Sequence, residues 1–137
     1  MRALEFLDTN VLLYLFSADA VKANRAEVLL AAGAVVSVQV LNEFASVASR
    51  KLKMSWPEIQ SVSSDLRRLC KVTSLSPQTH ERGLTIAARY GFSLYDAMIV
   101  ASALEAECNT LWSEDFQDGW SLERDITIRN PFIESIE

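Results

Sequence analysis

The stretch LEFLDTNVLLYLF, residues 4–16, decides the fold of this chain. Its first four residues form a short apolar run, which predicts a β-strand over Leu4–Leu7. The run ends in DTN at residues 8–10, three residue types that favour helix N-caps, and a short apolar helix is predicted over Val11–Phe16. A strand that passes directly into a helix through an acidic residue is typical of an α/β protein with a polar group at the carboxyl end of a strand.

The rest of the chain continues this alternation of strands and helices. Short apolar or β-branched runs predict further strands at Ala34–Val36, Val72, Thr110–Trp112 and Ile126–Ile128. Helical spacing, capping residues and Gly stops predict helices over residues 21–32, from Ser37, over 55–69, from Pro77 to Gly91, and over 93–107. The sequence therefore predicts a single α/β domain over residues 1–137, in which helices flank both faces of a short central parallel sheet.

Composition excludes several classes of protein. Half of the residues are hydrophobic and 23% are charged, which favours a packed domain, and no apolar run approaches the roughly 18 residues of a membrane span. Cys70 and Cys108 do not form a disulfide framework or a zinc motif, and with His80 as the one histidine a site with two histidine ligands is impossible. A net charge of −5 argues against nonspecific binding to nucleic acid through overall charge. Two carboxylates near the start, where a signal peptide is apolar, and the free thiols predict a cytoplasmic protein.

Four acidic residues lie where predicted strands end or where predicted helices enter the core. Asp8 follows the first strand and Asp115 follows the strand that ends at Trp112. Glu43 lies about two turns into the helix that begins at Ser37, and Asp96 lies in the first turn of an apolar helix. Because ligands of parallel sheets bind at the carboxyl ends of the strands, these acids are candidates for one shared site.

Each acid alone also has a structural explanation. Asp8 can simply cap the helix that it precedes, and Ser93 with Asp96 matches a capping box. Glu43 can be a solvated helix residue, and Asp115 can belong to a polar turn. Taken together, however, gathered carboxylates that stay ionised repel one another by several kcal/mol unless a cation neutralises them.

A divalent metal ion is the cation that this pattern favours, since none of the four acidic segments contains a Lys. Ligands that are all oxygen select a hard ion, Mg²⁺ or Mn²⁺, over Zn²⁺. Such an ion keeps several waters and completes its coordination with phosphate oxygens of a substrate. The sequence leaves open whether one ion binds or two.

The segments around these acids resemble those of PIN-domain ribonucleases. LDTNVLLY at residues 7–14, NEF at 42–44, LYDAMIVA at 94–101 and SEDFQDG at 113–119 are similar to the acidic segments of that family, in the same order. The length of the chain and the last segment resemble the VapC-type toxins of bacterial and archaeal toxin–antitoxin modules.

The resemblance implies an endoribonuclease that depends on Mg²⁺ or Mn²⁺. It implies that Asp8, Glu43, Asp96 and Asp115 are the catalytic, metal-binding acids, and that Asp118 assists the metal through water. Thr9 and Ser113 would orient ligands or a water through their hydroxyl groups, whereas Asn10 fits either that role or a helix cap. The resemblance also implies a homodimer, and a cognate antitoxin whose C-terminal segment blocks the acidic cleft.

An RNA substrate needs further contacts outside the acids. Peripheral cations would hold the flanking phosphates, and the candidates are Arg50, Lys51, Lys53, Arg82 and Arg89, which also suit ordinary solvated helix ends. Single-stranded or looped RNA is favoured over duplex RNA because exposed bases can be stacked and read. Trp56 and Trp120 can stack on bases, although packing in the core or a dimer suits them as well.

Two other functions compete with the nuclease. A phosphotransferase with a nucleophilic Asp8 is disfavoured, because such enzymes typically carry a second Asp two residues later, where this chain has Asn10. A catalytically silent PIN-like module that binds RNA or a partner keeps the fold without turnover. The presence of all four acids argues against that second alternative.

Overall fold

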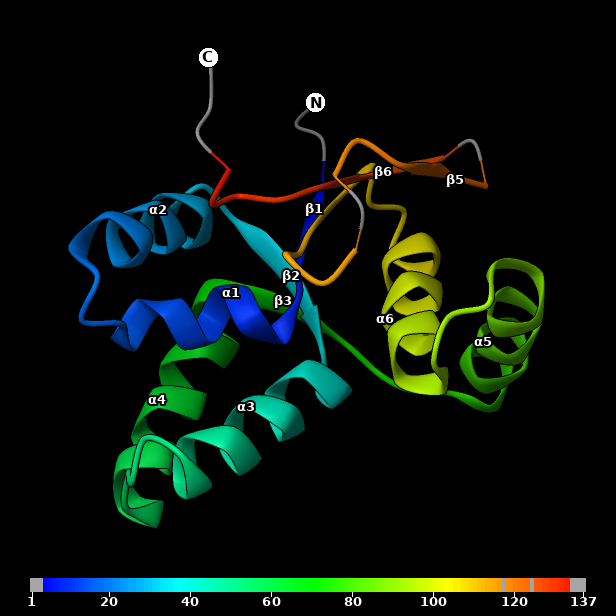
Figure 1. Cartoon of the computed structure of the whole chain (residues 1–137). Helices are drawn as coiled ribbons and strands as arrows, with labels where there is room; N and C mark the ends of the chain where they lie inside the picture. Colours follow the sequence, from blue (N-terminus) through cyan, green and yellow to red (C-terminus); the bar gives the residue numbers. More distant parts are fainter. Residues whose placement is uncertain (1–3, 117, 124, 134–137) are drawn as a thin grey trace.

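The structure, a computed structural model, describes residues 4–116, 118–123 and 125–133. One six-stranded sheet runs through this part of the chain in the order β3-β2-β1-β4-β6-β5 (Figure 1). Its strands are β1 (Glu5–Leu7), β2 (Ala34–Ser37), β3 (Cys70–Thr73), β4 (Thr110–Trp112), β5 (Ser121–Leu122) and β6 (Ile126–Arg129). Neighbouring strands are parallel except β5 with β6, which is antiparallel. The α/β class and the central parallel sheet are confirmed.

Helices connect these strands. They are α1 (Thr9–Leu13), the 3₁₀ helix η1 (Tyr14–Phe16), α2 (Ala20–Ala31), α3 (Val38–Arg50), α4 (Trp56–Leu69), α5 (Pro77–Tyr90) and α6 (Leu94–Glu105). Within the described residues, none of the helices has the length and apolar character needed to cross a membrane.

The helix ends follow the capping signals of the sequence. The Ser55 hydroxyl accepts a hydrogen bond from the Glu58 N–H at 3.2 Å, and the Glu58 carboxylate accepts one from the Ser55 N–H at 2.8 Å, so the predicted capping box opens α4. Ser76 caps α5 with Pro77 as the first helical residue, and Gly91 ends it with a φ of 75°. These local interactions explain why the boundaries of α4 and α5 could be predicted.

The strand order of the sheet changes direction at β1. The chain adds β2 and then β3 on one side of β1, and later places β4 on the other side. Leu7 pairs with Trp112, and the Asp8 N–H donates to the Trp112 carbonyl at 3.0 Å. The residues that follow both strands therefore emerge side by side at the carboxyl edge of the sheet, where α/β proteins bind their ligands.

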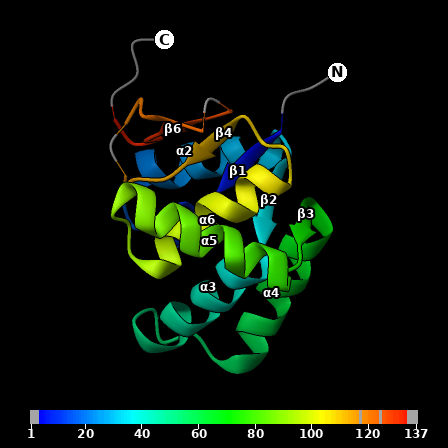
Figure 2. The ribbon, with the colours of Figure 1, turned by 90° about the vertical axis from the view of Figure 1, so that its right-hand side faces the viewer.

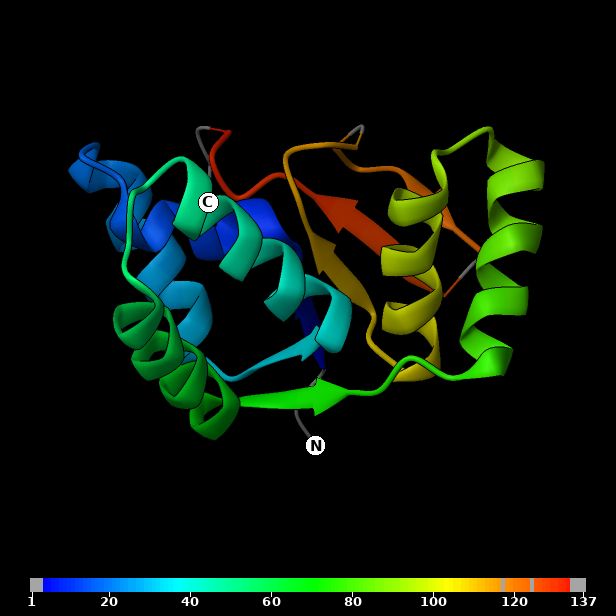
Figure 3. The same cartoon turned by 90° about the horizontal axis from the view of Figure 1, so that it is seen from below.

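Helices cover both faces of the sheet. In Figures 1 and 2, α6 lies against one face with α5 packed on its outer side, while α1 and α2 lie on the other side. Figure 3 views the carboxyl edge, which is flanked by the first turns of α3 and α6. Loops and helix starts from several parts of the chain therefore meet at the carboxyl edge of the sheet, which the helices do not cover.

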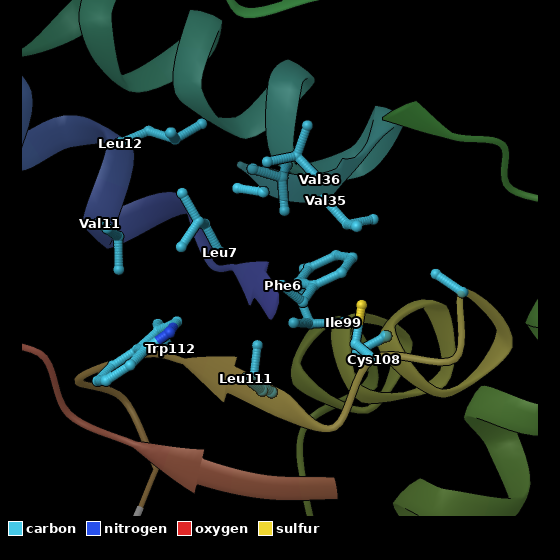
Figure 4. Packing of buried hydrophobic residues seen from close by; sticks show 14 of the residues in the cluster. Phe6, Leu7, Val11, Leu12, Val35, Val36, Ile99, Cys108, Leu111 and Trp112 are labelled. Atoms are coloured by element: carbon cyan, nitrogen blue, oxygen red, sulfur yellow. The ribbon is translucent and has the colours of Figure 1, made fainter. Parts of the chain in front are cut away.

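Strand residues alternate between two buried faces. Phe6 of β1 is fully buried and points towards Ile99 of α6, while its neighbour Leu7, also fully buried, points to the side of α1 (Figure 4). Leu111 of β4 pairs with Phe6 and is equally inaccessible. Burial on both faces explains why the central strands are short continuous apolar runs.

Besides shifts of one or two residues at the ends of elements, and a strand β3 that extends from Val72 to Cys70–Thr73, the structure differs from the sequence prediction as follows. The first helix begins at Thr9 rather than Val11, because Asp8 already caps it, and its last turn is the separate 3₁₀ helix η1. Strand β5 was not predicted, since Ser121–Leu122 is too short to give an apolar pattern. Its antiparallel pairing with β6, Ser121 with Thr127 and Leu122 with Ile126, cannot be read from two residues.

We expect Leu111→Ala to lower the free energy of unfolding by about 2–5 kcal/mol, because the truncation leaves a cavity in the central strand. Leu69→Ala is the matched control, since Leu69 is 56% exposed, and it should cost less than about 1 kcal/mol. Urea denaturation of the two variants measures both values. Equal losses would contradict this placement of the core.

Candidate active site

Asp8 is a buried carboxylate at the carboxyl end of β1, with 4% of its surface exposed. One carboxylate oxygen accepts a hydrogen bond from the Thr9 N–H at 2.6 Å, which caps α1. The other oxygen accepts from the Ser113 hydroxyl at 2.7 Å. The capping alternative is therefore correct for Asp8, but it accounts for one of the two oxygens.

Ser113 links the segments that follow β1 and β4. It is fully buried, and besides donating to Asp8 its hydroxyl oxygen accepts from the Asp115 N–H at 3.0 Å and from the Asn10 amide at 3.4 Å. Asp115 itself is exposed in the turn that follows. The Ser113 hydroxyl was expected to orient a ligand. It bonds to the Asp8 carboxylate and to the backbone N–H of Asp115.

Glu43 joins the same network from α3. The Thr9 hydroxyl donates to one of its oxygens at 2.7 Å, and the amide of Gln39 donates to the other at 3.4 Å. A solvated helix residue would have no such partners, so that alternative is wrong for Glu43. Sequence reasoning missed Gln39, although its position four residues before Glu43 places both on one face of α3.

Asp96 lies in the first turn of α6, opposite α3 across the carboxyl edge (Figure 3). Its backbone N–H donates to the Ser93 hydroxyl at 3.2 Å, as a capping box requires. The return bond from the Ser93 N–H to the Asp96 carboxylate is not formed in the described part of the chain. Half of the capping box is therefore present, and Ser93 still acts on the half-buried carboxylate by opposing the rise of its pKa.

The four acids share one electrostatic environment. The pKa of Asp8 is raised to about 7, chiefly by desolvation; its hydrogen bonds with Ser113 and Thr9 lower it, and the charges of Asp115 and Glu43 raise it. Desolvation also raises the pKa of Asp96, a hydrogen bond with Ser93 opposes that rise, and the charge of Asp115 adds to it. Burial and neighbouring carboxylates therefore disfavour the ionised forms of Asp8 and Asp96.

The donor chemistry of this cluster suits a hard divalent ion. All of the candidate ligands are carboxylate oxygens, and the ion pairs of the described residues, Arg68–Asp65 and Arg89–Glu123, involve none of them. In the described residues, no three Asp, Glu, His or Cys side chains stand close enough together to form a ready-made metal site. Hydrogen bonds thus connect Asp8 with Glu43 and with the Asp115 backbone, and the charge of Asp115 reaches Asp96, but the four carboxylates do not form a single ligand cage.

The SEDFQDG segment contributes less than the resemblance implies. Asp118 is exposed, and its carboxylate accepts a hydrogen bond from the Asn130 N–H at 2.6 Å, so it fixes the turn that leads away from β6. No hydrogen bond connects it to Asp8 or Ser113 among the described residues. Gln117 lies outside the described residues.

Cations gather beside the acids around Trp112. The guanidinium groups of Arg25 and Arg129 lie 5.2 Å and 5.1 Å from the Trp112 ring centroid. The pKa of Lys22 is raised, first by its hydrogen bond to Tyr14 and to a smaller extent by the charge of Glu114. Sequence reasoning missed these cations, because they come from α2 and β6 and meet only in the folded chain. Of the cations it did nominate, Arg89 is paired with Glu123 at 2.6 Å.

The two candidate tryptophans differ in their surroundings. Trp120 packs edge-on against Tyr90 and Phe92, with ring centroids 6.1 Å and 5.3 Å away, so it belongs to an aromatic cluster. Trp56 is 60% exposed at the start of α4. The packing alternative is therefore correct for Trp120, whereas base stacking by Trp56 stays a prediction.

Cysteine chemistry does not compete with the acids. Cys70 and Cys108 are both free and buried. Desolvation raises the pKa of the Cys70 thiol to about 11 and that of Cys108 to about 12. Neither thiol is available as a thiolate nucleophile near neutral pH.

Comparison with known proteins identifies the family. The model of the PIN domain matches residues 6–117, which contain β1 to β4 and all four candidate acids, and the chain therefore belongs to the PIN-domain family. A search of curated proteins finds no match.

Solved structures share this fold. A toxin–antitoxin complex from Klebsiella pneumoniae is similar with a TM-score of 0.72 and 21% identity, covering 93% of this chain and 98% of that one. VapC20 of Mycobacterium tuberculosis, a sarcin–ricin loop cleaving toxin, gives a TM-score of 0.66 and 18% identity, covering 81% and 91%. FitAcB of Neisseria gonorrhoeae gives 0.64 and 14%, covering 93% and 98%. At these identities the likeness establishes the fold.

The raised pKa of Asp8 predicts how stability depends on pH. The folded chain binds this proton more tightly (pKa about 7) than the unfolded chain, in which an aspartate has its ordinary pKa of 3.8. The proton therefore adds to the free energy of unfolding below about pH 4, and this contribution is lost as the pH rises through 7. We expect Asp8→Asn, which can keep the cap, to exceed the wild type in stability at pH 8 in EDTA by up to about 4 kcal/mol.

Urea denaturation of the wild type and Asp8→Asn across pH 4–8 measures this difference, which should shrink as the pH falls. Asp125→Asn, at an exposed position away from the cluster, is the control. A difference between the wild type and Asp8→Asn that stays constant with pH would contradict a buried, desolvated carboxyl.

Proposed function

We propose that this protein is a divalent-metal-dependent endoribonuclease, and the toxin of a toxin–antitoxin pair. The observation that carries the proposal is that Thr9 and Ser113 link the buried Asp8 by hydrogen bonds to Glu43 and to the Asp115 backbone, while the charge of Asp115 acts on both Asp8 and Asp96. Membership of the PIN-domain family supports nuclease activity in general.

Asp8, Glu43, Asp96 and Asp115 would hold Mg²⁺ or Mn²⁺, and Asp118 would assist through water. An ion bound there supplies charge stabilisation for the phosphoryl group and an activated water for hydrolysis. The chain's own residues prepare the ligands: the Thr9 hydroxyl orients Glu43, and the Ser113 hydroxyl orients Asp8 and the Asp115 backbone. Outer hydrogen bonds of this kind fix the orientation of ligating carboxylates.

Cations on both sides of the acids would bind the flanking phosphates of the substrate. Arg50 lies seven residues after Glu43, roughly 10 Å further along α3. Arg25 and Arg129 stand around Trp112 on the other side, next to the turn that carries Asp115. This distribution reconciles a net charge of −5 with binding of a polyanion, because the positive groups lie near the site.

Single-stranded or looped RNA is the substrate that we favour. Exposed bases can be stacked and read, whereas the grooves of duplex RNA offer few readable edges. VapC20, which shares the fold, is a sarcin–ricin loop cleaving toxin, and this supports a looped RNA. A cognate antitoxin is part of the proposal, supported by the toxin–antitoxin complexes among the similar structures. A cytoplasmic homodimer, which the resemblance and the free thiols favour, completes it.

One observation favours the alternative of a silent binding module. The acids of the described residues form no ready-made cage of three ligands. Incubation of the purified protein with structured RNA in Mg²⁺, Mn²⁺ or EDTA separates the two functions. RNA that binds but stays intact in all three buffers would favour the module.

Asp96→Asn tests the catalytic assignment. We expect cleavage to fall by at least about 100-fold, because one metal ligand is lost. Stability in EDTA should stay unchanged or rise, since a carboxylate that repels Asp115 is removed. A gel assay with labelled RNA and a thermal melt measure the two effects.

Glu114→Gln is the matched control for Asp96→Asn. Glu114 adjoins Asp115, but only its backbone N–H donates a hydrogen bond, to the Asn10 side chain at 3.4 Å. Its carboxylate bonds to none of the acids among the described residues, and cleavage should remain near the wild-type rate. Loss of stability in Asp96→Asn without a specific loss of cleavage would assign Asp96 to capping alone.

The flanking cations make a separate prediction for binding. In the Asp96→Asn background, Arg129→Gln or Arg50→Gln should each weaken binding of a single-stranded RNA and lower the slope of log K against log salt by about 0.7. Lys71→Gln, on the edge strand β3, should change neither quantity. Fluorescence anisotropy at several salt concentrations measures the slope, and equal slopes for all variants would rule out these phosphate contacts.

A further inference from the structure

We propose that a pocket beside Glu43 binds one unpaired nucleobase of the RNA substrate. The pocket has a volume of about 360 Å³ and is lined by Gln39, Asn42, Glu43, Ser46, Leu75 and Tyr95. This inference rests on the proposed nuclease function and deepens it, because it states how the site would choose the RNA that it cuts.

The pocket is continuous with the candidate active site through Glu43, which lines the pocket and also accepts the hydrogen bond from the Thr9 hydroxyl. A base that occupies the pocket would place its own backbone next to the acids. Its size lies near the lower end of the roughly 300–1,000 Å³ of small-ligand sites, which suits one base and not a base pair.

Gln39 is a buried polar side chain that lines the pocket. It is 93% buried, with 7% of its surface exposed, and its amide nitrogen donates to the Tyr95 carbonyl at 3.1 Å and to Glu43 at 3.4 Å. The two N–H groups of this side chain are thereby used, while no donor of the described residues bonds to its carbonyl oxygen. Gln39 thus joins α3 to the first turn of α6 and leaves one acceptor for a ligand.

Asn42 and Tyr95 also present groups that are free to bind, whereas the Ser46 hydroxyl accepts a hydrogen bond from Arg50 at 3.4 Å. Asn42 is exposed on α3, and its amide makes no hydrogen bond within the described residues. Tyr95 is 64% exposed, although it directly precedes Asp96 in a buried helix. Leu75, 41% exposed, adds an apolar surface.

This combination matches the chemistry of an unpaired base. A tyrosine ring offers a stacking surface to any base, and such stacking contributes to binding without the need for a fixed sequence. Asn and Gln amides recognise base edges, because they can donate and accept side by side. The free side-chain carbonyl oxygens of Gln39 and Asn42 favour a base that presents an amino group, that is adenine, cytosine or guanine over uracil.

The test compares Tyr95→Ala, Tyr95→Phe and Asn42→Ala with the wild type on a library of short single-stranded RNAs that is randomised around the cleaved bond. We expect Tyr95→Ala to raise KM about tenfold with a smaller effect on kcat, as loss of one stacked base would. Tyr95→Phe keeps the ring and should restore KM. Asn42→Ala should relax the preference for amino-bearing bases at one position.

Leu84→Ala is the matched control, since Leu84 is 48% exposed on α5 and lines no part of this pocket. The wild-type KM and base preference in both Tyr95→Ala and Asn42→Ala would overturn the inference. A change in self-association of Tyr95→Ala, seen by analytical ultracentrifugation, with RNA preference intact would assign the pocket to a protein interface and would also overturn it.

A binding experiment distinguishes failure of this inference from failure of the nuclease proposal. The Asp96→Asn protein and its double variant with Tyr95→Ala are titrated with the same RNAs in EDTA, so cleavage is not needed for the readout. Weaker and less base-selective binding by the double variant supports the pocket even if the wild type cuts no RNA. Equal binding of both proteins overturns the pocket even if the wild type is an active nuclease.

Discussion

The parallel pairing of β1 with β4 is the constraint on which the site depends. Leu7 lies opposite Trp112, and the Asp8 N–H continues the ladder to the Trp112 carbonyl. Asp8 and Ser113, which are 105 residues apart in the chain, thereby come within 2.7 Å of each other. Two hydrogen bonds stabilise the Asp8 carboxylate in its buried position, yet they do not offset the desolvation that raises its pKa. A shift of this pairing by one residue would turn the side chains to the other face and separate the acids.

The helix starts around the carboxyl edge reduce the cost of gathering negative charge. Asp8 caps α1 and Ser93 caps α6, with Asp96 in its first turn, while α3 begins after Ser37 at the end of β2. The positive end of each helix dipole therefore faces the region where the acids meet. The same arrangement makes Asp8 and Asp96 both suited to helix starts and candidates for ligands, which is why capping could explain each of these two alone.

Local signals in the sequence were sufficient for the fold, and they were sufficient for part of the site. The capping box at Ser55 and the Gly91 stop act between neighbours in the chain, so the ends of α4 and α5 could be predicted. Acids at strand ends could be nominated for the same reason. The contacts of Gln39 with Tyr95, and of Arg25 with Trp112, join residues 56 and 87 positions apart through tertiary packing, and no pattern in the sequence encodes them. The short strand β5 escaped prediction because two residues carry no periodicity.

The place of β4 in the middle of the sheet has a consequence for synthesis of the protein. Strand β4 lies between β1 and β6, but it is translated after more than a hundred other residues. Until Thr110–Trp112 leave the ribosome, the nascent chain has β1, β2 and β3 without the strand that brings Ser113 to Asp8. A ribosome that stalls earlier, or a transcript cut within this message, therefore yields a fragment in which the acids of the amino-terminal half have no partner segment to meet.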